Sequence, residues 1–101
     1  MYARVTTFYI DLAKRKEAID IYENSIIPAA ENQEGFRSAF FLVNKNAGKF
    51  ISITMWENME YAVANQKSGY YQAQIDKLAP LQVVVPDIEG LEVAALKHNF
   101  D

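Results

Sequence analysis

The 101-residue sequence predicts one α+β domain spanning residues 1–101, with a ferredoxin-like βαββαβ order and its helices on one face of an antiparallel sheet. Two patterns support this prediction. Segments rich in β-branched and aromatic residues alternate with segments whose apolar residues recur every three or four positions. A chain of this length also fits a single domain and leaves no room for a second.

The first third of the chain is predicted to form a strand and a helix. Tyr2–Ile10 is rich in β-branched and aromatic residues, and Asp11 can cap the helix that follows. Apolar residues then recur at helical spacing from 14 to about 32, with charges on the opposite side. Pro28 is expected to kink the last turn or to restart the helix there, and Gly35 to end the helix in a left-handed conformation.

A hairpin is predicted in the middle of the chain. Residues 36–45 and 49–57 have strand composition, and Asn46-Ala47-Gly48 between them is typical of a tight turn. Asn58 is expected to cap a second helix that runs to about Lys67.

The last third of the chain is predicted to be less regular. Ser68-Gly69 interrupts the second helix, and Tyr70–Leu78 is predicted to be a further short helical piece. Pro80 and Pro86 lie in an extended link, and Leu91–Lys97 is predicted to be the final strand.

Both faces of the predicted sheet carry large apolar side chains, because strand residues alternate between the two sides. One face is expected to hold Phe41 and Val43 together with Ile51, Ile53 and Met55. Leaving five such side chains in water would forfeit about 10 kcal/mol of burial free energy and favour aggregation. We therefore expect a homodimer in which a second copy covers this face. In the alternative, the segment 70–89 folds over it.

Composition excludes several classes of function. Ten Lys and Arg residues against thirteen Asp and Glu, without a basic stripe, argue against nucleic-acid binding. The absence of Cys excludes disulfides and thiolate metal sites. Neither a signal-peptide pattern nor an apolar run of about 20 residues is present. A cytoplasmic protein without a membrane partner is therefore expected.

Three short motifs resemble the antibiotic biosynthesis monooxygenase-like family of the dimeric α+β barrel superfamily. They are Glu34-Gly35-Phe36, the run from Ile51 to Asn58 that contains Trp56-Glu57, and Ser68-Gly69-Tyr70-Tyr71. The resemblance implies a homodimer whose sheets stack into a barrel, with a pocket between sheet and helices in each subunit. Relatives oxidise phenolic or anthrone-like polyketides or quinols, degrade haem or act on signalling molecules, and many have no assigned activity.

The resemblance implies two catalytic candidates, Trp56 and Asn65. Trp56 matches the strand-end tryptophan that lines the substrate pocket of active relatives, although it could equally fill the core. Asn65 stands near the helix position where the family commonly has a histidine, used as the iron ligand in the haem-degrading branch. An amide is neither a competent haem ligand nor a general base. The lone His98 supports no metal site, so neither a metal nor a cofactor is expected.

The predicted substrate-binding residues share hydroxyl groups that could orient a ligand in an apolar pocket. They are Ser52, Thr54, Thr7, Tyr9, Tyr61 and Tyr70. Each has a structural alternative, either ordinary strand filling or packing around the interrupted second helix. Periodicity alone does not tell which set of strand residues faces the pocket.

These observations favour cofactor-independent oxidation of a small aromatic or quinol substrate, in which the deprotonated substrate supplies the electrons. The alternative is a non-enzymatic homodimer that binds a small molecule, because no residue is a convincing general base. Haem degradation and a purely structural dimerisation module are the other two possibilities.

Overall fold

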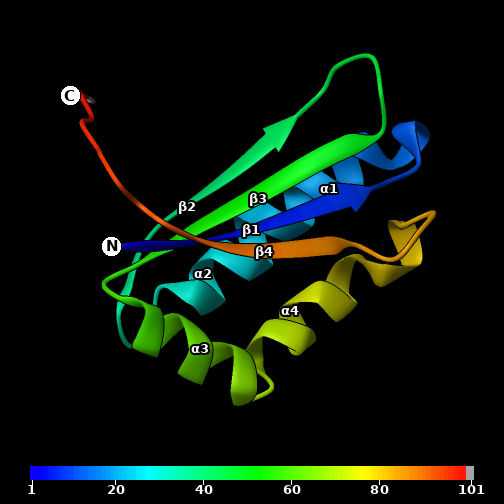
Figure 1. The fold of residues 1–101 in the computed structure, drawn as a ribbon. Helices are drawn as coiled ribbons and strands as arrows, with labels where there is room; N and C mark the ends of the chain where they lie inside the picture. Colours follow the sequence, from blue (N-terminus) through cyan, green and yellow to red (C-terminus); the bar gives the residue numbers. More distant parts are fainter. Residues whose placement is uncertain (100–101) are drawn as a thin grey trace.

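The computed structural model describes residues 1–99, which form a four-stranded antiparallel sheet of order β2-β3-β1-β4 with helices packed on one face (Figure 1). The elements in chain order are β1 (Tyr2–Tyr9), η1 (Leu12–Lys14), α1 (Arg15–Ile21), η2 (Tyr22–Ile26), α2 (Ile27–Ala30), β2 (Phe36–Val43), β3 (Lys49–Trp56), α3 (Met59–Lys67), α4 (Tyr70–Leu78), η3 (Ala79–Leu81) and β4 (Asp87–Glu92). This arrangement confirms the predicted ferredoxin-like βαββαβ fold.

Two helical segments begin where the capping residues Asp11 and Asn58 predicted them, whereas α2 ends at Ala30 and not at Gly35. The side chain of Asp11 accepts a hydrogen bond from the Ala13 N–H, and that of Asn58 accepts one from the Tyr61 N–H. Gly35 has a φ of 81°, and a side chain there would overlap the ring of Tyr61. Glycine is therefore required at this turn for its conformation and for the space that it leaves.

Helical turns continue from α1 through η2 to α2, and Pro28 lies in α2. The segment η2 is a wide π-helical turn, in which the Ile27 N–H bonds the Tyr22 carbonyl five residues back. It ends two residues before Pro28, which has no N–H to continue the regular ladder of helical hydrogen bonds. No helix within residues 1–99 is long and apolar enough to cross a lipid bilayer.

A β-bulge in β2 changes which residues face the helices. The register between β2 and β3 shifts between Phe36 and Ser38, so Arg37 has no partner in β3. The prediction that Phe41 and Val43 share a face with Ile51, Ile53 and Met55 is wrong, because strict alternation does not hold across the bulge. The face opposite the helices instead carries Phe40 and Leu42, which pair with Ile53 and Ile51.

The last strand lies earlier than predicted. β4 covers Asp87–Glu92 and pairs with β1, whereas the sequence predicted a strand over Leu91–Lys97. Every residue of β4 is exposed, so its pairing depends on backbone hydrogen bonds and not on an apolar pattern. Gly90 leaves room for the Tyr2 side chain beside the strand.

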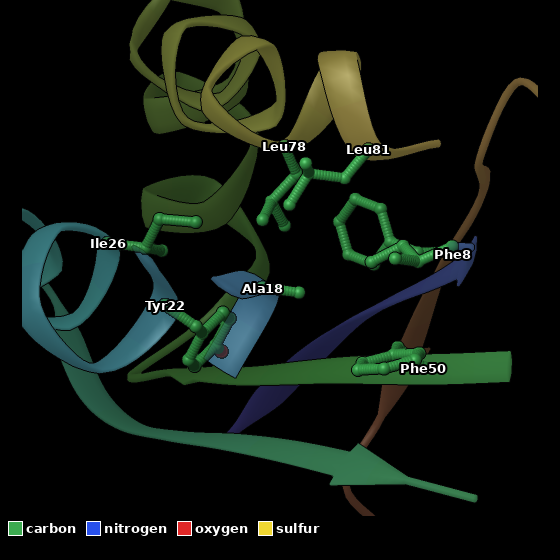
Figure 2. Packing of buried hydrophobic residues seen from close by; sticks show 8 residues of the cluster. Phe8, Ala18, Tyr22, Ile26, Phe50, Leu78 and Leu81 are labelled. Atoms are coloured by element: carbon green, nitrogen blue, oxygen red, sulfur yellow. The ribbon is translucent and has the colours of Figure 1, made fainter. Parts of the chain in front are cut away.

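The hydrophobic core lies between the sheet and the helices (Figure 2). Its buried members are Phe8, Ile10, Ala18, Tyr22, Ile26, Phe50, Leu78 and Leu81. In Figure 2 the side chains of Phe8 and Phe50 from the sheet point toward those of Leu78 and Leu81 from the end of α4 and η3. The ring of Tyr22 stacks on Phe41 at a centroid distance of 4.1 Å. These contacts hold the helix layer on the sheet.

Candidate functional site

A cavity lies between sheet and helices, next to the core cluster. Its sheet wall is made of Arg4, Thr6, Ser52, Thr54 and Trp56. Its helix wall is made of Ile26, Ala30, Tyr70, Tyr71, Gln74 and Ile75. The cavity has a volume of about 40 Å³. That is enough for about three water molecules and is smaller than the cavity of about 150 Å³ that accepts benzene.

The cavity lies where the helix-facing residues of two paired strands change from large and apolar to small and polar. Residues that pair across β1 and β3 share a face, and the helix-facing pairs change from apolar to polar along the strands. From the core toward the cavity these pairs are Phe8 with Phe50, Thr6 with Ser52, Arg4 with Thr54, and Tyr2 with Trp56. Small hydroxyl side chains in the middle of this series leave space that larger residues would fill.

Trp56 is completely buried at the polar end of β3. Its indole N–H donates to the Thr54 Oγ1 at 3.0 Å, so Thr54 and not a ligand holds this donor in the structure. The edge-to-face contact with Phe36, at 5.8 Å between centroids, supports the ring from β2. The indole is therefore held rigidly by its neighbours on the sheet.

Arg4 is a site residue that the sequence reasoning missed. Only 5% of the residue is exposed, and the guanidinium carbon lies 5.1 Å from the ring centre of Trp56 and 4.3 Å from that of Tyr71. Both contacts are cation–π interactions. Arg4 also donates to the Ala62 carbonyl at 3.3 Å and to the Asn65 Oδ1 at 2.9 Å. The charged group is thus buried among aromatic rings and neutral acceptors.

The Arg4 cation is buried without a neighbouring carboxylate among the described residues. Within residues 1–99 no Asp or Glu oxygen lies within 4.0 Å of Arg4. Burial lowers the pKa of Arg4, and the nearby hydroxyls of Tyr71, Tyr70 and Tyr22 act in the opposite direction. Because arginine is not deprotonated in proteins, the side chain carries its positive charge. A buried charge of this kind is normally paired.

Asn65, a predicted catalytic residue, lies behind Arg4 and does not line the cavity. It is 7% exposed, accepts from Arg4 and donates through Nδ2 to the Gln33 Oε1 at 3.1 Å. Its amide therefore connects the guanidinium to the turn that follows α2. In this position Asn65 orients Arg4.

The hydroxyl groups of the cavity differ in what they can offer a ligand. The Tyr22 hydroxyl donates to the Phe40 carbonyl at 3.2 Å, so Ser52, 2.7 Å away, must be the donor to Tyr22. The Thr6 and Tyr71 hydroxyls bond each other at 2.7 Å. The buried hydroxyl of Tyr70 has no hydrogen-bond partner within residues 1–99. Tyr70 therefore supplies this wall with a hydroxyl that can bond a ligand without first giving up a contact.

The structure brings three of the six predicted substrate-binding residues together and leaves three outside. Ser52, Thr54 and Tyr70 line the cavity with Trp56. Thr7 pairs with Ile51 and Tyr9 with Lys49, so both lie on the sheet face opposite the helices. Tyr61 packs against Gly35 instead of lining the cavity. Arg4, Thr6 and Phe8 show which face of β1 contacts the helices, because all three are buried. Thr7 and Tyr9 alternate with them and therefore point to the other side.

The cavity combines apolar walls, an aromatic surface and one fixed positive charge. Its lining contains no Asp, Glu or His, so none of the usual proton acceptors near neutral pH contacts its interior. Within residues 1–99 no cluster of three His, Asp or Glu side chains could hold a metal ion. These walls offer a ligand an aromatic surface and a fixed positive charge that can stabilise negative charge, but the cavity in the structure is too small for an aromatic ring.

Solved structures of other proteins share this fold. A monooxygenase from the gene ActVA-Orf6 of Streptomyces coelicolor, solved with the ligand Nanaomycin D, superposes with a TM-score of 0.79 and 16% identity, over 98% of this chain and 92% of that chain. A protein of unknown function from Nitrosomonas europaea, NE2512, gives a TM-score of 0.76 and 19% identity, over 99% of this chain and 95% of that chain.

A third structure comes from Deinococcus radiodurans and is of a protein proposed to be an antibiotic biosynthesis monooxygenase. It gives a TM-score of 0.77 with 16% identity over 100% of both chains. At such identities these likenesses show a common fold. No curated protein matches the sequence. The family model for antibiotic biosynthesis monooxygenase, however, matches residues 1–77, which include β1, β3 and all the residues that line the cavity. The chain therefore belongs to the antibiotic biosynthesis monooxygenase family.

Proposed function

We propose that the chain binds a small aromatic or quinol substrate in the cavity beside Trp56 and promotes its oxidation by O₂ without a cofactor. The observation that carries this proposal is the polar end of the buried β1–β3 face, where Trp56, Arg4 and the Tyr70 hydroxyl surround a cavity. Membership of the monooxygenase family supports it.

For oxidation by O₂ without a cofactor, the protein must position its substrate and remove water from around it. In oxidation of an anthrone, for example, one O₂ converts a ring methylene to a carbonyl and its second oxygen atom leaves as water. The electrons come from the ionised substrate, so the protein supplies orientation and exclusion of water. The ring of Trp56 offers a surface for stacking, and the indole N–H can exchange the Thr54 hydroxyl for a ligand oxygen as its acceptor.

An aromatic substrate requires the cavity to widen. The sheet wall is fixed by strand pairing, whereas four residues of the other wall come from α4, which begins directly after Gly69. Gly69 has a φ of 89°, and the space into which a side chain would project there is open to a radius of 4 Å. Substrate binding is therefore expected to displace α4 outward while the strands stay in place.

Oxygen consumption tests the proposal. Purified protein is mixed with a panel of quinols and anthrones in an oxygen electrode, in parallel with a Trp56→Phe variant and a Val85→Ala control on the surface. We expect uptake by the parent and the control, and a loss of about tenfold in Trp56→Phe, which corresponds to about 1.4 kcal/mol of lost stabilisation. Uptake that is equal in all three proteins would refute a role for Trp56 in oxidation.

A second candidate function is binding without turnover, and the absence of Asp, Glu and His from the cavity lining favours it. A thermal-shift screen with the same panel separates the two functions, because a bound ligand raises the melting temperature whether or not it reacts. Ligands that stabilise the protein and cause no oxygen uptake would support a binding protein.

We also propose that a second copy of the chain covers the open face of the sheet. Phe40, Leu42 and Leu91 on that face are 36%, 48% and 46% exposed, and Ile51 and Ile53 between them are only partly buried. Stacking two such faces would remove a contiguous apolar surface from water. The open face of the sheet is therefore the proposed interface of the homodimer that the family resemblance implies.

Light scattering after size exclusion tests the dimer. Ile53→Lys places a charge at the centre of the open face and is expected to give a folded monomer, whereas Val85→Lys, on the exposed link, should stay dimeric. A parent protein that is monomeric at micromolar concentration would contradict the proposal.

A further inference from the structure

We propose that Arg4 makes the cavity selective for the ionised form of an aromatic ligand, a phenolate or a hydroquinone monoanion, and thereby replaces the missing general base. This inference rests on the proposed function only in assuming that an aromatic ligand enters the cavity. It adds the charge state of that ligand and the residue that selects it.

The guanidinium of Arg4 has N–H donors that no protein group accepts from. An arginine carries five N–H donors, and Arg4 uses two of them, toward the Ala62 carbonyl and the Asn65 Oδ1. The other three have no acceptor within residues 1–99. A cation that is 5% exposed cannot satisfy these donors by full hydration. Arg4 lines this cavity and also a second, more open hollow beside Tyr2 and Ala62, so water reaches part of the guanidinium. The donors that face the first cavity can exchange their water for an oxygen acceptor on a ligand.

The groups around Arg4 carry no negative charge. Its protein acceptors are a carbonyl and an amide, and the wall beside it holds the neutral hydroxyls of Thr6, Tyr70 and Tyr71. None of the residues that line this wall carries a negative charge, and one full positive charge attracts an anion at low local dielectric. A neutral ligand would gain much less from the same position.

The groups that hold Arg4 also suit a planar ligand. The guanidinium lies over the rings of both Trp56 and Tyr71, which fixes its plane. Asn65, held by Gln33, fixes one of its edges. The buried Tyr70 hydroxyl supplies a separate donor on the α4 side. An oxygen anion on an aromatic ring can accept from both sides while its ring packs on the apolar wall.

The chemical consequence is ionisation without a protein base. A phenol or quinol that binds beside Arg4 releases its proton to water, and the anion left behind is stabilised by the guanidinium. The O–H bond breaks, its electron pair stays on the ligand oxygen, and no group of the protein changes its protonation state. The electron-rich anion is the form that reacts with O₂ in the proposed function.

The test compares two probes of nearly equal shape, 4-nitrophenol and 4-nitroanisole, of which only the first can ionise. Calorimetry gives their affinities, and the visible absorbance of nitrophenolate gives the ionised fraction of the bound probe at each pH. We expect the phenolate to bind about 10- to 100-fold more tightly than the anisole, as for hydrogen bonds to a charged group. The apparent pKa of bound 4-nitrophenol should fall by about one to two units.

Two variants identify the source of this preference. Arg4→Met keeps much of the side-chain volume without the charge, and it should bring the affinity ratio of the two probes close to one. Arg37→Met removes a positive charge from the exposed bulge of β2 and should leave the ratio unchanged. If Arg4→Met does not fold, the ratio and the absorbance shift measured on the parent protein still test the selectivity for the anion, and Arg4→Lys, which keeps the charge, tests the role of the residue.

The outcomes separate this inference from the proposed function. Equal binding of both probes, with no shift in the ionisation of 4-nitrophenol, overturns the anion selectivity and leaves the aromatic pocket intact. A preference that persists in Arg4→Met assigns it to another group and overturns the role of Arg4. Binding of neither probe overturns both the selectivity and the aromatic pocket.

Discussion

The space between sheet and helices has two ends that are built from the same two strands and differ in chemistry. At one end Phe8 and Phe50 pack with Leu78 and Leu81 through apolar contacts. At the other end Arg4 lies beside Trp56, and the strand residues around them are the hydroxyl-bearing Thr6, Ser52 and Thr54. The apolar end stabilises the contact between sheet and helices. At the polar end, burial of the Arg4 cation is unfavourable because the charge loses its hydration. The difference shows that apolar packing and the candidate site occupy opposite ends of β1 and β3.

The largest expected effect comes from the apolar end. Phe50→Ala should lower the free energy of unfolding by about 3–5 kcal/mol, because Phe50 is completely buried and its loss leaves a cavity. Urea denaturation measures this change. Val85→Ala, at a residue that is 85% exposed, should change the free energy by less than about 0.5 kcal/mol. A comparable loss in both variants would show that the core is not where the structure places it.

Tyr22 lies at the boundary of the two ends, since it belongs to the core cluster and bonds Ser52 at the cavity. Tyr22→Phe keeps the ring stacked on Phe41 and removes the hydroxyl. We expect the free energy of unfolding to fall by about 0.5–1.5 kcal/mol, the usual net value of a hydrogen bond. Denaturation of Tyr22→Phe beside Phe50→Ala measures the difference, and a loss as large as that of Phe50→Ala would contradict this assignment.

Alkaline pH should weaken the fold through two tyrosines that line the cavity and through Tyr22 in the neighbouring core. Burial raises the pKa of Tyr22, Tyr70 and Tyr71, so the folded state holds their protons more tightly than the unfolded chain does. Their contribution is complete below the unfolded pKa of about 10 and is lost as the pH rises through the folded values.

Unfolding curves at pH 7, 9 and 11 measure this dependence. The decrease in the free energy of unfolding between pH 9 and pH 11 should be smaller in Tyr22→Phe than in the parent. An identical pH dependence in the two proteins would exclude Tyr22 as a contributor.

The smallest expected effect on stability comes from the polar end. Arg4→Met should leave the free energy of unfolding within about 1 kcal/mol of the parent, because the desolvation of a buried cation offsets its favourable contacts. Urea denaturation tests this. A loss that approaches that of Phe50→Ala would mean that Arg4 is a structural residue, and the division between the two ends would not hold.

The sequence was sufficient to predict the order of the elements, because strand composition, helical periodicity and capping residues agree along most of the chain. Asp11, Gly35 and Asn58 act at the turns where their chemistry requires them. β4 was misplaced because a fully exposed edge strand needs no apolar pattern, and Asp87–Glu92 contains little that favours a strand.

The candidate site was predictable only in part. Trp56, Ser52 and Thr54 follow from alternation within one strand, but Thr7 and Tyr9 were chosen before the face of β1 was known. Arg4 was overlooked because a charged residue in a strand is usually exposed. Its burial depends on contacts with Tyr71 and Asn65, which are more than 60 positions away in the sequence. Such contacts cannot be read from local composition.

The only tryptophan of this chain is the one beside Arg4, and it is completely buried. Excitation at the red edge of the indole absorption therefore produces light from one place in the molecule. A ligand that enters the cavity will quench or shift this emission while the apolar end remains folded. The protein thus carries its own optical reporter of occupancy, which requires no label and can be followed on the time scale of mixing.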